Sequence, residues 1–173
     1  MTRLALGTVQ FGLNYGVANY SGQTNLSEVK KIIKLARKAS VDLVDTAISY
    51  GNSEKIIGEV GITDFRFVTK LPPILNNNKD ITSWVEKMVK DSLERLGVKS
   101  IYGLLIHRYK DLLRDNGKKL VYALDQIKTS GLVKKIGISI YDPSEIGQVI
   151  DLLKIDIIQA PLNIIDRRLE ISG

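Results

Sequence analysis

The chain has 173 residues, 44% of them hydrophobic and 25% charged, which is the composition of a globular domain with a sizeable core. It has no cysteine, which excludes disulfides and zinc–thiolate sites, and no apolar run approaches the roughly 18 residues that a membrane-spanning helix needs. The net charge of +6 does not indicate a nucleic-acid partner, because the basic residues over 30–38 alternate with apolar ones, as on the solvated face of an amphipathic helix.

The amino-terminal stretch MTRLALGTVQFG lacks the uninterrupted apolar segment of a signal peptide. We therefore expect one domain over residues 1–173, located in the cytoplasm. We expect no membrane, nucleic-acid or metal partner.

Six short apolar runs rich in β-branched residues follow one another along the chain. They are continuous rather than alternating, which is typical of parallel strands covered on both faces. The expected strands lie at residues 3–9, 41–47, 66–71, 102–107, 134–140 and 155–161.

Helical patterns separate these runs. The expected helices span residues 25–39, 53–60, 82–96 and 118–129, with two more beginning at the DPSE stretch and near residue 165. Asn25 is placed to cap the first helix, whose apolar stripe runs from Val29 to Ala39. Gly97 stands where a glycine ends a helix, and Asp142 is the expected N-cap of the DPSE helix.

Strands that alternate with helices leave two architectures, a doubly wound sheet and a (β/α) barrel. A dinucleotide-binding sheet would carry a G-x-G-x-x-G turn after its first strand, and the stretch GTVQFGLNYG has a different glycine spacing. The sequence therefore predicts an α/β fold of the (β/α)8 TIM-barrel class. Because eight units usually need about 250 residues, we expect an incomplete barrel with about six units.

Polar side chains stand where these strands end. Asp45, Lys70 and His107 close the second, third and fourth strands, and Tyr50 follows in the loop after the second. Catalytic groups of barrel enzymes lie at these carboxyl ends. Each residue alone has an ordinary structural explanation, but their joint placement at successive strand ends indicates a site.

The chemistry of this set is specific. A phenol has an ordinary pKa near 10, and a Lys70 ammonium beside Tyr50 is expected to lower the pKa of that phenol. Asp45 would keep Lys70 charged, and His107 would orient a substrate carbonyl. The set suits protonation of a carbonyl oxygen while its carbon accepts a hydride.

Several stretches resemble the aldo-keto reductase family. DTAISYGNSEKIIGE resembles the signature after that family's second strand, FVTKLPP its lysine segment and YGLLIHR its histidine segment. GLVKKIGIS and IDIIQAPLN are similar to its fifth and sixth strands, so the likeness covers nearly the whole chain. The resemblance implies a (β/α)8 barrel that reduces small aldehydes or ketones with NADPH, or catalyses the reverse oxidation.

By position, the resemblance implies the role of each catalytic residue. Tyr50 would be the general acid, with Lys70 and Asp45 as the pair that tunes it. His107 would be the orienting residue.

The resemblance also implies a cofactor site. Ser139 and Gln159 match groups that hold the nicotinamide carboxamide, and Gly7 and Thr8 lie in the first-strand loop that borders the cofactor. Ile140 stands where the family usually has asparagine.

Two readings compete with a reductase. The sequence ends before the family's seventh and eighth strands, so this chain is expected to bind cofactor weakly and to turn over slowly or not at all. It could instead be a non-catalytic remnant that self-associates through open edges at the first and sixth strands. An aldolase that uses Lys70 as a Schiff-base amine is a third reading, although such chemistry does not need Tyr50 at its spacing.

Overall fold

The computed structural model describes residues 4–75, 78 and 80–171, in which six parallel strands form one sheet. The strands are β1 (Leu6–Gly7), β2 (Leu43–Asp45), β3 (Arg66–Leu71), β4 (Ile101–Ile106), β5 (Val133–Ser139) and β6 (Ile157–Gln159). Each strand pairs with the next in sequence, so the sheet order is β1-β2-β3-β4-β5-β6. The predicted incomplete barrel of about six units is confirmed.

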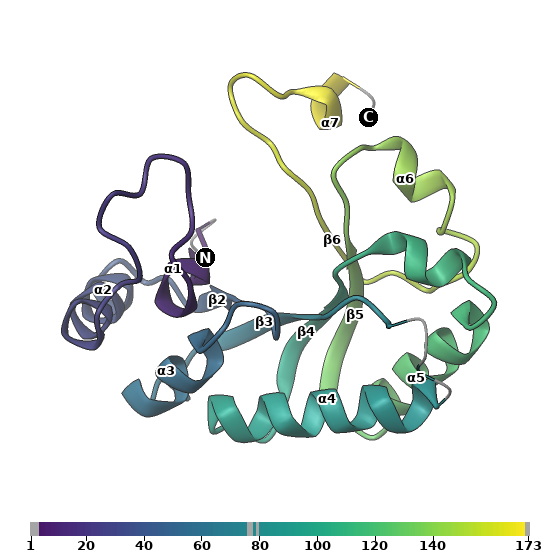
Figure 1. Cartoon of the computed structure of the whole chain (residues 1–173), viewed down its shortest axis with the longest axis horizontal. Coiled ribbons are helices and arrows are strands. Elements are labelled where there is room, and N and C mark those ends of the chain that lie inside the picture. Colours follow the sequence, from purple (N-terminus) through teal and green to yellow (C-terminus); the bar gives the residue numbers. More distant parts are fainter. Residues whose placement is uncertain (1–3, 76–77, 79, 172–173) are drawn as a thin grey trace.

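Helices lie between consecutive strands and after the last one, and the longer helices cover one side of the sheet. They are α1 (Val9–Gly12), α2 (Leu26–Lys38), α3 (Ser53–Val60), α4 (Ile81–Leu96), α5 (Gly117–Thr129), α6 (Ser144–Gly147) and α7 (Arg168–Ile171), with a 3₁₀ turn, η1, at Tyr109–Leu113. Figure 1 shows the sheet curled like part of a barrel wall, with α3, α4 and α5 along its convex side.

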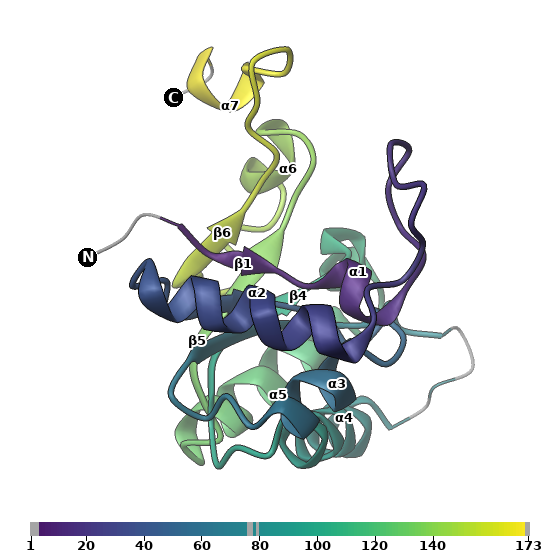
Figure 2. The same cartoon turned by 90° about the vertical axis from the view of Figure 1, so that its left-hand side faces the viewer.

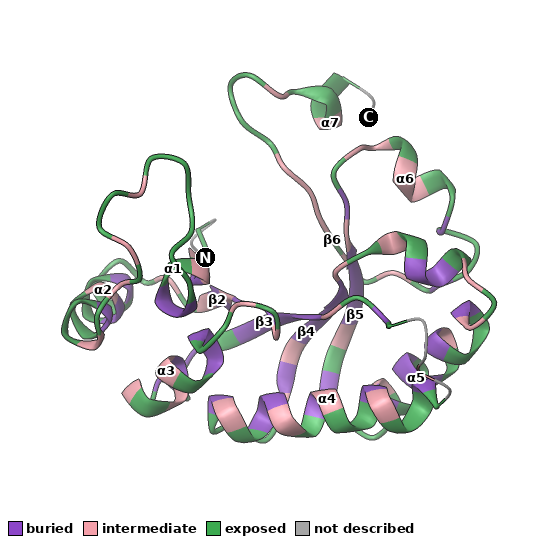
Figure 3. Ribbon diagram, in the orientation of Figure 1, coloured by how far each residue is buried: buried purple, intermediate pink, exposed green. Residues whose placement is uncertain are grey.

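The core lies between this convex face and the helices. Phe67 and Leu104 from the sheet and Val89 and Leu124 from the helices are each at most 2% exposed. Figure 3 shows burial concentrated on the central strands and on the helix faces turned toward them. This packing accounts for the apolar residues on the face of the strands that is turned toward the helices.

Two segments project away from the sheet on the same side. Residues 13–24 form one, and the segment that runs from β6 through α7 forms the other, as both Figure 1 and Figure 2 show. Both segments are largely exposed. They flank the carboxyl ends of the strands.

The predicted strands are all confirmed, but the outer ones are short. β1 has two residues and β6 has three, and each pairs with a neighbour on one side only. The expected open edges at the first and sixth strands are therefore present. None of the described helices is long and apolar enough to cross a membrane.

The helix predictions were right in place and wrong in detail. The Asn25 side chain accepts a hydrogen bond from the Glu28 N–H, as expected of a cap, but Ala39 is exposed rather than part of the apolar stripe. The DPSE helix begins one residue later than predicted, after Pro143, although Asp142 still accepts from the Ser144 N–H. The last helix begins at Arg168 rather than near residue 165.

Candidate functional site

A cluster of buried hydroxyls holds the loop that carries Tyr50. The Ser53 hydroxyl donates to the Thr8 carbonyl at 2.9 Å and lies 3.2 Å from the Thr46 hydroxyl. The Thr8 hydroxyl donates to the Asp45 carbonyl at 2.9 Å. All three hydroxyl residues are at most 1% exposed, so the end of β1, the end of β2 and the start of α3 are joined into one unit.

A close backbone approach fixes the same loop from the other side. A Cβ atom added at Gly12 would lie only 1.7 Å from the Tyr50 carbonyl oxygen, so no larger residue fits there without a backbone shift. Gly51, next to Tyr50, has φ +55°, a conformation that glycine adopts without strain. Tyr50 is thus carried by backbone that has little freedom to move.

Glu54, the residue after Ser53, anchors the start of α3 to its neighbours. Its carboxylate is 2% exposed and accepts from the hydroxyls of Thr69 and Ser92, each at 2.7 Å, and from the Arg95 guanidinium at 2.9 Å. A carboxylate that is buried this far needs such partners, because an unpaired charge in the core is costly. The contact links α3 to β3 and α4.

Lys70 and Asp45 form the central ion pair at the carboxyl ends of β3 and β2. The Lys70 ammonium lies 2.8 Å from an Asp45 carboxylate oxygen and donates to the Thr46 carbonyl at 2.8 Å. Only 2% of the Lys70 side chain is exposed, against 21% for Asp45. The Gln159 side-chain amide donates to the same Asp45 oxygen at 2.9 Å, so β6 also contributes to this cluster.

The rings of Tyr50 and His107 complete the group. The Lys70 ammonium lies 5.0 Å from the centre of the Tyr50 ring. The His107 ring meets that of Tyr50 edge to face, with 6.2 Å between centroids. The structure therefore brings Asp45, Tyr50, Lys70 and His107 together, and both rings are half-buried.

The predicted lowering of the Tyr50 pKa is wrong. Burial, reinforced by the Asp45 carboxylate, raises the pKa of the phenol to about 12. The reason is that Asp45 neutralises Lys70 at close range, so the pair exerts little net pull on the phenol and the cost of exposing a phenolate to a poorly solvated site remains. The phenol is protonated at neutral pH.

The other two titratable groups are shifted in the direction that burial dictates. Burial lowers the pKa of Lys70, and the Asp45 carboxylate opposes that shift. Burial and the Lys70 charge lower the pKa of His107 below its ordinary value of 6.5. His107 is therefore a neutral imidazole at pH 7.

Of the four residues assigned to the cofactor, two lie at the end of β1 and two at the ends of β5 and β6, and they differ in accessibility. Ser139 and Gln159 are paired in the sheet register and both are half-buried. Gly7 is exposed, with no atom within 4 Å of the position of a Cβ. Thr8 is buried, and its hydroxyl is committed to Asp45 and Ser53 rather than turned outward.

Sequence reasoning missed the residues that support the site. Thr46, Ser53 and Glu54 belong to the signature stretch, yet only Tyr50 and Asp45 were given roles. Asp111 was also missed: it accepts from the Arg108 guanidinium at 2.6 Å and from the Ile74 N–H at 3.1 Å, which joins the loops after β3 and β4. Polar residues directly beside a buried strand end were the available signal, because such groups need partners.

Comparisons with known proteins agree with this fold. The model of the Aldo/keto reductase family matches residues 3–172. An NADH-specific methylglyoxal reductase of Escherichia coli (strain K12) is 25% identical over 98% of this chain and 58% of its own length. The chain spans 58% and 59% of the length of two curated relatives that it matches.

Solved structures give the same picture. The holo form of an aldo-keto reductase from Bacillus halodurans superimposes with a TM-score of 0.77 at 23% identity, covering 97% of this chain and 56% of that one. An aldo-keto reductase from Bombyx mori superimposes with a TM-score of 0.69 at 25% identity, covering 92% of this chain and 54% of that one. The curled sheet described above is thus the arrangement of strands in the matched part of those barrels.

Proposed function

Because this chain belongs to the aldo/keto reductase family, we propose that its protein reduces a small aldehyde or ketone to an alcohol, or catalyses the reverse oxidation, with a nicotinamide cofactor. One observation carries the proposal. Asp45, Lys70, Tyr50 and His107 come from three strand ends and one loop. Contacts of 2.8 Å between Asp45 and Lys70, 5.0 Å between Lys70 and the Tyr50 ring, and 6.2 Å between the Tyr50 and His107 rings connect them. Core packing alone does not require an acid, a lysine, a tyrosine and a histidine to lie together.

The residues at the ends of β5 and β6 fit a nicotinamide in part. Ser139 offers a hydroxyl, and the side-chain oxygen of Gln159 is left as an acceptor, since the amide nitrogen donates to Asp45. Ile140 is 1% exposed and packs in the core, so it offers no replacement for the amide of the family's asparagine. The cofactor, when bound, supplies the hydride. Ser139 and Gln159 would hold its carboxamide, and Gly7, at the end of β1, has no atom within 4 Å of the position of a Cβ.

Tyr50 is the proposed proton donor. A phenol with a pKa of about 12 is fully protonated at neutral pH, and the alkoxide that forms on carbonyl reduction is a stronger base than a phenolate. Proton transfer from the Tyr50 hydroxyl to that oxygen is therefore downhill. The Lys70–Asp45 pair lies beside the Tyr50 ring, and the neutral His107 can donate one hydrogen bond to the carbonyl oxygen.

We predict NADPH as the cofactor. The matched structure from Bombyx mori is a complex with NADP, whereas the Escherichia coli relative is named as NADH-specific, so both cofactors belong in the test. Methylglyoxal, the substrate in that relative's name, is the first carbonyl compound to try. A cytoplasmic location remains a prediction.

The experiment follows the loss of reduced-cofactor absorbance with methylglyoxal, using a longer form of the protein that has measurable turnover and the Tyr50→Phe variant of that same form. We expect the variant to be at least about 100-fold slower, because a positioned general acid contributes roughly 10² to 10⁴ in rate. Cofactor binding, followed by Trp84 and cofactor fluorescence, should be unchanged in the variant. Equal rates in the two proteins would remove Tyr50 as the acid. Borohydride trapping at Lys70 would instead favour the aldolase reading.

Self-association through the open sheet edges is the second candidate function. It is supported by β1 and β6, each paired on one side only, and by apolar side chains exposed along and after β6, including Ile158 at 43% and Leu162 at 61%. An open strand edge can pair with another chain. Sedimentation should then show a concentration-dependent dimer, whereas a monomer at all concentrations would rule this candidate out.

A further inference from the structure

The opposite end of the sheet holds a groove that the proposed reaction does not use. It has a volume of about 410 Å³ and lies where β3, β4 and β5 begin. Arg66 is the first residue of β3, and Tyr102 and Lys134 are the second residues of β4 and β5. We call this space the floor groove. Lys70 and His107 stand at the other ends of β3 and β4, so the two regions face opposite ends of the same strands.

The lining of the floor groove is one-sided in charge. Arg66, Lys99 and Lys134 contribute three cations, and none of its described lining residues is an aspartate or glutamate. Three further cavities in the described part of the chain each include a carboxylate, namely Asp125, Asp142 or Glu86. The positive charge of the floor groove is therefore a local feature rather than a reflection of the net charge alone.

Two cations lie close to the Tyr102 ring, beside the floor groove. The Arg66 guanidinium lies 4.8 Å from the centre of the Tyr102 ring, and the Lys135 ammonium lies 5.3 Å from the same centre. Asp42 is paired with Arg66 at 2.9 Å, and both side chains remain about half exposed. Asp42 partners Arg66 and Asp156 interacts with Lys135, so Lys99 and Lys134 are the lining cations that supply a positive potential for anions.

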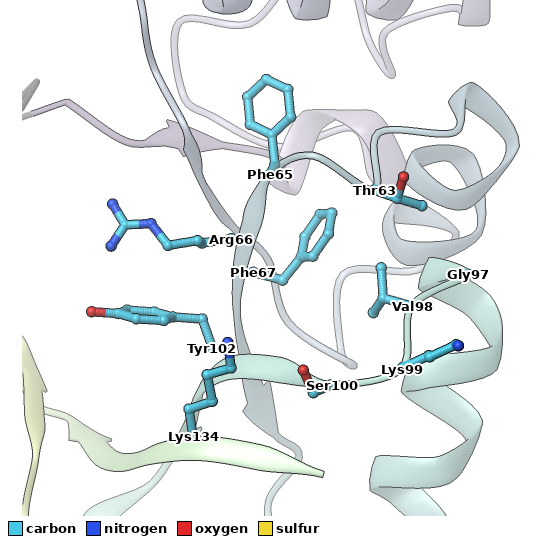
Figure 4. Close-up of a pocket in the computed structure, with 10 residues that line it drawn as sticks. All are labelled: Thr63, Phe65, Arg66, Phe67, Gly97, Val98, Lys99, Ser100, Tyr102 and Lys134. Carbon is cyan, nitrogen blue, oxygen red and sulfur yellow. The ribbon is translucent and has the colours of Figure 1, made fainter. Parts of the chain in front are cut away.

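The side chains differ in how they face the groove. Figure 4 shows the Arg66 and Tyr102 side chains extending in the same direction, with the Lys134 chain rising toward Tyr102, whereas Lys99 extends the opposite way. Phe65 and Val98 add apolar surface to the wall. A ligand here would meet guanidinium and ammonium donors on one side and carbon atoms on the other.

We propose that the floor groove binds a small organic phosphate, with the phosphate held by Arg66 and Lys134 and the organic part lying against the apolar wall. The planar guanidinium can form paired hydrogen bonds to a phosphate, and lysine adds a point charge. The volume is that of a small-molecule site rather than of a single ion. This site is independent of the proposed reductase activity, because it shares no residue with the group at the other end of the sheet.

The test uses phenyl phosphate, which carries both parts of the proposed ligand and is not a fragment of a nicotinamide cofactor. Titration into ¹⁵N-labelled protein should give saturable shifts of the Arg66, Tyr102 and Lys134 amides. Phenol and inorganic phosphate should each bind at least about tenfold more weakly. Affinity should fall as salt is added, because the contacts are exposed to screening.

Two charge reversals distinguish a site from general attraction. Lys134→Glu should weaken phenyl phosphate binding at least about tenfold, which corresponds to about 1.4 kcal/mol. Lys30→Glu changes the net charge equally on the exposed face of α2 and should leave the affinity within about twofold. Equal losses in the two variants, shifts that never saturate, or shifts centred on Tyr50 and His107 would each overturn the proposal. Both lysines are exposed, so the variants are expected to fold, and Trp84 fluorescence checks this.

Discussion

The two ends of the parallel sheet differ in how their positive charges are balanced. At the carboxyl end, Lys70 is 2% exposed and bonded at 2.8 Å to Asp45, so its charge is cancelled within the protein. At the amino end, Arg66 is 44% exposed and pairs with Asp42, and Lys99 and Lys134 line the same groove. Burial forces charges to pair, whereas exposure lets like charges accumulate. The comparison therefore separates a preorganised neutral site from an open cationic one.

Removing a lysine should have very different costs at the two ends. Lys70→Met leaves the Asp45 carboxylate without its ion pair and the Thr46 carbonyl without a donor, and should lower the free energy of unfolding by about 3 kcal/mol. Lys134→Met at the floor groove should change it by less than about 0.5 kcal/mol. Urea unfolding followed by Trp84 fluorescence measures both. Similar losses would contradict the distinction between the two ends.

The hydroxyl cluster under Tyr50 should give the next largest effect. Ser53→Ala removes a donor to the Thr8 carbonyl and leaves buried polar atoms unpaired, so we expect a loss of about 2 kcal/mol in the free energy of unfolding. Ser27→Ala is the matched control, because the Ser27 hydroxyl bonds to Asn25 on an exposed helix start. The control should be near neutral. A Ser53 variant as stable as the control would show that the cluster does not hold the loop.

The sequence predicted the strands and the polar side chains that meet at their carboxyl ends, because both depend on local signals. A continuous apolar run identifies a buried strand, and a polar residue at its end identifies a position at the mouth. The partners of those residues were harder to predict. Gln159 and Thr8 were assigned to the cofactor, but each donates a hydrogen bond to Asp45, 114 and 37 residues away in sequence. The tertiary arrangement determines which hydrogen-bond partner each of these side chains has.

The Tyr50 pKa and the floor groove were missed for a related reason. The direction of the phenol shift depends on burial and on whether Asp45 neutralises Lys70, and neither can be read from spacing. Arg66, Tyr102 and Lys134 are separated by more than 30 residues at each step, and strand register brings them together. The sequence signal for the groove was a cation near the start of each of these strands. Lysines at such positions usually serve only to keep a strand end in contact with solvent.

A smaller effect concerns His107, the single histidine of the chain. Its pKa is lowered from 6.5 by burial and by Lys70, so the unfolded chain binds a proton there more readily than the folded chain does. Stability should consequently fall as the pH drops below 6.5, and His107→Gln should remove that part of the slope. The single imidazole resonance in a proton NMR titration reports the pKa directly. A midpoint above 6.5 would contradict the assignment.

The central claim is that Lys70 and Asp45 act as a neutral pair beside a protonated phenol. A titration of ¹³C-labelled tyrosine by NMR tests it most directly, with Tyr50→Phe identifying the Tyr50 resonance. Tyr50 should remain largely protonated at pH 11, as a pKa of about 12 requires. A free tyrosine, whose ordinary pKa is near 10, is by then ionised and serves as the reference. A Tyr50 midpoint at or below pH 10 would show that the Lys70 charge is not cancelled and would contradict the account.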